Sequence, residues 1–124
     1  MNEPQKIFCF GNPYIKEDSL AIELADELKI EGFEFLKAYS PDFLMDYSGD
    51  LYILDVAKGI ENVEVIEDIS FLSSNEMLSL HDFDLQFFLK LLDELGNLGK
   101  VKIFAIPLDY DKEKAIFELK QLIK

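Results

Sequence analysis

The sequence contains no arginine, one histidine and one cysteine. All 12 basic residues are lysines, so no guanidinium group is present for two-point recognition of phosphate or carboxylate, which excludes arginine-assisted phosphoryl transfer. The chain has one histidine, His81, so any metal site, Ser-His pair or Cys-His pair must use that ring. The single cysteine, Cys9, excludes an internal disulfide, and its place in an apolar run predicts a buried side chain rather than a nucleophile.

The sequence also lacks the patterns of nucleotide, nucleic-acid and membrane binding. Gly11-Asn12-Pro13 ends an apolar run, but the further glycines of a dinucleotide fingerprint and the Gly-Lys-Ser/Thr of a phosphate loop are missing. The formal net charge of -13 opposes binding to nucleic acid or an anionic membrane, and no lysine cluster offsets it. Without a long apolar span or the apolar core of a signal peptide, we expect a soluble, cytoplasmic protein with no nucleic-acid or membrane partner.

The residues that are present predict one α/β domain, residues 1–124. Of its 124 residues, 49% are hydrophobic, which is enough for a compact core. Short apolar runs predict strands at 6–10, 33–36, 51–54, 63–66 and 102–106. Helical spacing predicts helices at 20–28, 85–95 and 115–123, with a brief helix at 42–47. The alternating order predicts a three-layer α/β/α sandwich with a mostly parallel sheet of about five strands.

The helix that ends near Leu95 has a wide apolar face. Its helically spaced apolar residues are Leu85, Phe88, Leu89, Leu92 and Leu95. Phe87 and Leu91 widen that face. This pattern predicts that the helix is well buried.

Three ionisable residues stand out by position. Asp18 follows the first strand, Asp55 follows the central strand, and His81 precedes the wide-faced helix, and ligands of open α/β sheets bind at the carboxyl ends of the strands. Each has a simpler interpretation: Asp18 could cap the helix from Ser19, Asp55 could accept hydrogen bonds from the turn at 58–59, and His81 could lie in a surface loop. Together they would form an incomplete coordination set for Zn²⁺, Ni²⁺ or a similar ion.

Four short motifs occur in order along the chain. They are Gly11-Asn12 followed by Glu17-Asp18, the apolar strand from Leu51 that reaches Asp55 and Gly59, Ser79-Leu80-His81, and the strand from Lys102 to Pro107. Together they resemble the motifs of the maturation endopeptidases of nickel-iron hydrogenases. Members of this family remove a C-terminal extension from the hydrogenase large subunit after nickel insertion.

The resemblance implies a function and a role for each motif residue. It implies an aspartyl-type endopeptidase that recognises the nickel already carried by its substrate, the large-subunit precursor, and that needs no organic cofactor. Asp18, Asp55 and His81 would bind that nickel, and Gly11 and Asn12 would contact the substrate. Asp18 or Asp55 would also be catalytic, as a general base, with polarisation of water by the metal as the alternative.

The chain departs from the family pattern in two places. Family members carry glycine in the first helical turn, where this chain has Ser19 to Ile22, and a Gly-Gly-Thr-type loop where it has Ala38 to Asp42. The second loop is thought to accommodate substrate. Two other functions therefore stay open. One is a non-catalytic, nickel-dependent chaperone or checkpoint that binds immature hydrogenase, and the other is a small binding module without a metal.

Overall fold

The structure is a computed structural model that describes residues 3–11, 14, 19–67, 79–80, 83–96 and 98–123. Its strands are β1 (Gln5–Phe10), β2 (Phe33–Ala38), β3 (Gly49–Lys58), β4 (Glu64–Ile66), β5 (Ser79–Leu80) and β6 (Leu98–Pro107). Its helices are α1 (Leu20–Glu27), the 3-10 helix η2 (Pro41–Asp46), α3 (Phe83–Leu95) and α4 (Lys112–Leu122). Each predicted strand and helix is present, with shifted ends.

The strands form one mostly parallel sheet, as predicted. Their order is β2-β1-β3-β6-β4, in which β2, β1, β3 and β6 are parallel and β4 runs antiparallel to β6. The short strand β5 was not predicted. It pairs antiparallel with the end of β3, with Leu80 opposite Ala57 and Ser79 opposite Lys58.

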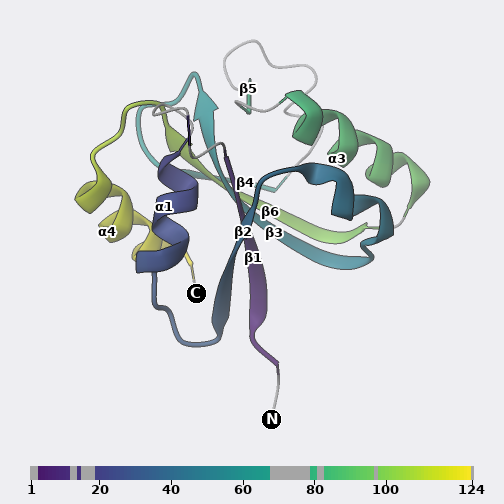
Figure 1. Cartoon of the computed structure of the whole chain (residues 1–124), viewed down its shortest axis with the longest axis horizontal. Helices are drawn as coiled ribbons and strands as arrows, with labels where there is room; N and C mark the ends of the chain where they lie inside the picture. The colour runs from purple at the N-terminus through teal and green to yellow at the C-terminus, as the bar shows by residue number, and fades with distance from the viewer. Residues whose placement is uncertain are drawn as a thin grey trace.

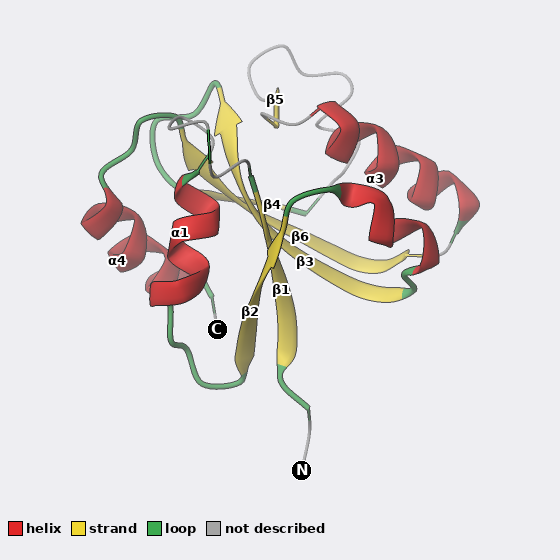
Figure 2. Cartoon of the chain, in the orientation of Figure 1, coloured by secondary structure: helices red, strands yellow, loops and turns green. Residues whose placement is uncertain are grey.

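Helices cover both faces of the sheet, which confirms the three-layer sandwich (Figures 1 and 2). Helices α1 and α4 lie on one face, and α3 with η2 lies on the other. No helix in the described ranges is both long and apolar enough to cross a membrane.

Alternation along β3 divides the core into two clusters. Leu51 and Ile53 pack with Leu89 of α3, whereas Leu54 packs with Leu24 of α1 and with α4. Successive side chains of a strand point to opposite faces, so a central strand with helices on both sides is apolar throughout. This is the origin of the continuous apolar run that predicted β3.

Strand β3 is longer than its apolar run predicted. The run ends at Leu54, but β3 continues to Lys58 because Val56 and Ala57 pair with β6. Gly59 then ends the strand with a φ of 90°, a left-handed conformation that glycine adopts without steric cost. Asp55 therefore lies inside the central strand rather than after it.

Candidate functional site

The site begins at the carboxyl ends of β1 and β3, which are neighbours in the sheet. Cys9 of β1 lies opposite Leu54 of β3, so Gly11 and Asp55 follow this pair at the same edge. From β1 the chain enters α1 on one face, whereas α3, the helix described between β3 and β6, lies on the other face. Connections that leave adjacent parallel strands toward opposite faces open a crevice between them, which is the usual ligand site of such sheets.

Asp55 is the strongest candidate for a functional side chain among the described residues. Its side chain is fully buried, and no other acidic side chain among the described residues is buried. The backbone N–H of Val56 donates a hydrogen bond of 2.8 Å to Asp55 Oδ1, which fixes the orientation of the carboxylate. Removing a carboxylate from water is costly, so a carboxylate buried at a ligand-binding edge indicates function.

The alternation of β3 determines which layer Asp55 faces. Ile53 and Ala57, two residues before and after it, belong to the cluster that packs under α3. Asp55 therefore points to the α3 side of the sheet. Strand β5 reaches the same place, because Leu80 pairs with Ala57. The backbone that leads up to position 81 thus runs beside β3, two positions from Asp55.

The other predicted site residues divide into two groups. Gly11 is described, and it lies at the same edge as Asp55, whereas its contact with substrate stays a prediction. Asn12, Asp18 and His81 lie outside the described residues, so their convergence on Asp55 stays a prediction. Within the described ranges, no group of three or more His, Cys, Asp or Glu side chains could hold a metal ion. Of the three predicted metal ligands, only Asp55 lies among the described residues.

Cys9 is a buried thiol, as its position in the strand predicts. Its side chain is fully buried, and its Sγ lies 3.9 Å from the carbonyl oxygen of Ile7. Burial, and after it the negative charge of Asp55, raises the pKa of Cys9 from 9.0 to about 12. The thiol is therefore protonated at neutral pH, which makes Cys9 a poor nucleophile.

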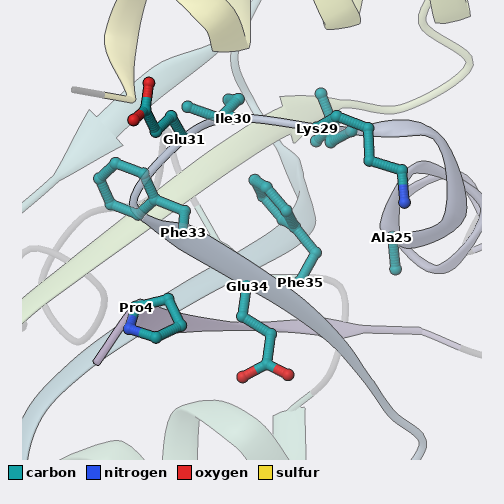
Figure 3. A pocket seen from close by; sticks show the side chains of 9 residues that line it. Pro4, Ala25, Lys29, Ile30, Glu31, Phe33, Glu34 and Phe35 are labelled. Atoms are coloured by element: carbon teal, nitrogen blue, oxygen red, sulfur yellow. The ribbon is translucent and has the colours of Figure 1, made fainter. Parts of the chain in front are cut away.

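A pocket of about 550 Å³ lies away from this site. Figure 3 shows the side chains that line it. It is formed by the end of α1, the turn that follows it and the first half of β2, which is an outer strand of the sheet. The residues that line it are Pro4, Ala25, Leu28, Lys29, Ile30, Glu31, Phe33, Glu34 and Phe35. Because β2 is parallel to β1 and β3, its first half lies toward the amino ends of the strands, opposite Asp55. The pocket is therefore separate from the candidate site.

The comparison with known proteins gives matches of structure and none of sequence. No protein-family model matches the chain, and no curated protein matches it at a significant level. A [NiFe] hydrogenase maturation protease, HybD from Thermococcus kodakarensis, matches with a TM-score of 0.65 over 98% of this chain and 100% of that one, at 16% identity. The chain has the fold of the hydrogenase maturation proteases.

Two enzymes of Escherichia coli share this hydrogenase maturation protease fold. The endopeptidase HycI matches with a TM-score of 0.67 over 96% of this chain and 88% of that one, at 16% identity. The hydrogenase maturating endopeptidase HybD matches with a TM-score of 0.64 over 98% and 90%, at 13% identity. The resemblance found in the four motifs is thereby confirmed at the level of the fold.

Proposed function

We propose that the chain is an endopeptidase that removes the C-terminal extension from a nickel-loaded hydrogenase large-subunit precursor. The observation that carries the proposal is the buried carboxylate of Asp55, at the carboxyl edge of the central strand of a hydrogenase maturation protease fold. The enzyme would act in the cytoplasm and would be of the aspartyl type. Its nickel belongs to the substrate, and no organic cofactor takes part.

In this proposal Asp18, Asp55 and His81 bind the nickel held by the precursor. Docking of the metal places the peptide bond to be cleaved beside the enzyme, which makes the attack of water effectively intramolecular. Gly11 has no side chain, so an extended substrate segment can approach the backbone at the end of β1, beside Asn12. A carboxylate, Asp18 or Asp55, acts as the general base, or the bound metal polarises the attacking water.

The burial of Asp55 gives this recognition its selectivity. Because the carboxylate is fully buried, the residues that cover it must move before it can bind a metal. That movement costs free energy, and only a precursor that brings nickel offsets the cost by ligation. A precursor without nickel would make the same protein contacts but would lack this contribution, so it would stay uncut.

The test is the mass of the large subunit before and after incubation with the enzyme. Wild-type protein should shorten a nickel-loaded precursor, whereas Asp55→Asn, Asp18→Asn and His81→Ala should each leave it intact. Asp50→Asn is the matched control, because Asp50 is an exposed carboxylate at the other end of β3 and accepts a hydrogen bond from Lys100 N–H that an amide oxygen can keep. Full cleavage by Asp55→Asn would overturn the proposal.

The same experiment examines the nickel-dependent checkpoint. A carboxylate that is reached only after rearrangement would serve equally well to sense nickel without hydrolysis. A checkpoint protein would bind nickel-loaded precursor and leave its mass unchanged. Addition of wild-type protein at equal concentration, followed by size-exclusion chromatography and mass measurement of the complex, separates the two functions.

A further inference from the structure

Helix α3 carries apolar side chains on its outer side as well as on its core side. Phe87 is 63% exposed and Leu95 is 57% exposed, with the partly exposed Leu91 midway between them. Residues four apart lie on one face of a helix, so these three side chains form a continuous line, which we call the α3 ridge. The ring of Phe88 extends the apolar surface and meets the ring of Phe87 edge to face, with centroids 5.9 Å apart.

The ridge is not part of the core. The core side of α3 is formed by Leu85, Leu89 and Leu92, which are fully buried against the sheet. Figure 2 shows α3 on the outside of the sandwich, across the sheet from α1 and α4. The prediction of a well-buried helix was therefore wrong for its outer side, because the sheet covers only one side of α3.

The exposed apolar residues of α4 are arranged differently. Phe117 is 66% exposed and Leu122 is 40% exposed, but five positions separate them, which places them on different sides of the helix. Single exposed apolar side chains are ordinary on protein surfaces, whereas a contiguous line of them indicates a binding surface. Helix α3 therefore provides a candidate binding surface, and the exposed apolar residues of α4 provide a control within the same chain.

The ridge lies on the same side of the sheet as the candidate site. Asp55 points to the α3 layer, and β5, which pairs with β3 at Ala57, also contacts α3. A protein that reaches Asp55 from this side would extend over α3. The ridge is thus placed to contact the body of a macromolecule whose reacting part lies at the carboxyl edge of the sheet.

Area and charge select the kind of partner. At the exposed fractions given above, the ridge presents roughly 250 Å² of apolar surface, against about 800 Å² per partner in a stable interface. The ridge alone is therefore too small to hold a dimer, and it fits a contact that is completed at the site. A second copy would also bring a charge of -13 toward a charge of -13, whereas a basic protein surface would be attracted.

We propose that the α3 ridge docks the body of the precursor protein, through an apolar patch that lysine and arginine side chains surround. This inference rests on the proposed function and adds the surface by which the substrate is held. Because the ridge side chains are apolar and are not among the candidate site residues, the ridge contributes to binding of the substrate and not to the chemical step.

The test compares two double variants with the wild type on nickel-loaded, full-length precursor. Phe87→Ser with Leu95→Ser should raise KM about tenfold and change kcat by less than twofold. Phe117→Ser with Leu122→Ser, on α4, should leave both constants within twofold of the wild type. Exposed substitutions change stability little, and circular dichroism with urea unfolding verifies that both variants fold. An unchanged KM in the α3 variant, or an equal rise in the α4 variant, overturns the docking proposal.

Two further measurements keep this result separate from the fate of the proposed function. If the wild type does not cleave, the proposed function fails, and the affinity of each variant for the precursor, measured by titration calorimetry, then tests the ridge. Loss of affinity in the α3 variant alone supports docking, and equal affinities overturn it. Sedimentation equilibrium tests a second copy as the occupant: a wild-type dimer that the α3 substitutions dissociate also overturns the proposal.

Salt tests the charge of the partner. A basic surface around the patch predicts that the association rate falls as ionic strength rises, because electrostatic steering is screened. An association rate that does not depend on salt overturns the proposal that the partner's surface is basic.

Discussion

The two helical layers of the sandwich are alike toward the sheet and different toward solvent. Each layer buries a continuous apolar cluster, with Leu24 of α1 on one side and Leu89 of α3 on the other, both fully buried. The outer surface of the α1 and α4 layer is linked by charge: Lys112 of α4 forms ion pairs with Glu23 and Glu27 of α1. The outer surface of α3 carries the apolar ridge.

This difference indicates which of the two layers offers a contiguous apolar surface to a partner. The ion pairs between α1 and α4 form within the chain, whereas the apolar ridge would be stabilised further if another surface covered it. Asp55 faces the layer with the ridge. The layer that we propose to bind the precursor is therefore the layer that Asp55 faces.

The largest expected effect tests whether the two layers are equally well packed inside. Leu24→Ala and Leu89→Ala should each lower the free energy of unfolding by about 2–5 kcal/mol, because each removes a fully buried side chain and leaves a cavity. Urea unfolding of both variants measures it. A loss below about 1 kcal/mol for Leu89→Ala alone would show that α3 is loosely held. A rigid docking ridge would then be ruled out.

The next effect tests how completely the α1 and α4 layer excludes water from the Cys9 thiol. Cys9 packs in that cluster, and its folded-state pKa of about 12 lies above the ordinary value of 9.0. A raised pKa stabilises the folded protein fully below pH 9, and the contribution is lost as the pH rises from 9 toward 12. Between pH 8 and about pH 11 the wild type should lose about 1–3 kcal/mol more than Cys9→Ala, by urea unfolding at each pH.

Alkylation of Cys9 provides an independent measurement. Iodoacetamide should modify the thiol in urea and should leave it almost unmodified in the folded protein at pH 8, because the thiol is buried and protonated. Equal alkylation rates in urea and in the folded protein would mean that solvent reaches Cys9 in the folded state.

A smaller effect concerns the link between α4 and the start of β4. Glu118 accepts hydrogen bonds from the hydroxyl of Tyr110 and, at 3.4 Å, from the backbone N–H of Val63. Glu118→Ala should lower the free energy of unfolding by about 1 kcal/mol, because the backbone donor loses its acceptor. Glu118→Gln keeps an acceptor oxygen and should lose less. Equal losses in the two variants would show that the packing of the side chain matters rather than its oxygen.

The smallest effect tests the charge that joins α1 to α4. Lys112→Ala should lower Tm by only a few degrees at low salt and by less in about 1 M NaCl, because exposed ion pairs are weak and screened. Differential scanning calorimetry at the two salt concentrations measures this. A large decrease that persists in high salt would contradict a mainly electrostatic link.

Most of the fold could be predicted because apolar residues recur in its strands and helices with the spacing of each structure. The apolar runs of β1 and β6 and the helical spacing of α1 and α4 record which faces are buried. Strand β5 has two residues, too few for a period, so it was not predicted. The outer face of α3 was assigned to the core because composition shows that a face is apolar and cannot show what covers it.

The candidate site could be predicted in part for the same reason. Asp55 was found because a charged residue interrupts an apolar run. Its complete burial could not be read from the sequence, because it depends on pairing with β6 and on the continuation of β3 to Lys58. The pocket beside β2 was not predicted, because the apolar spacing of residues 25–35 does not show that the end of α1, the turn and β2 leave a hollow between them.

The shortness of β5 has a kinetic consequence for the end of the central strand. Only Ala57 and Lys58 pair with β5, whereas β3 pairs with β6 along most of its length. A two-residue strand is detached by local opening at a small fraction of the free energy that unfolds the sheet. The amide protons of Ser79 and Leu80 should therefore exchange with solvent long before those of Ile53. We therefore expect β5 to separate from β3 and pair with it again many times within the lifetime of the folded sheet.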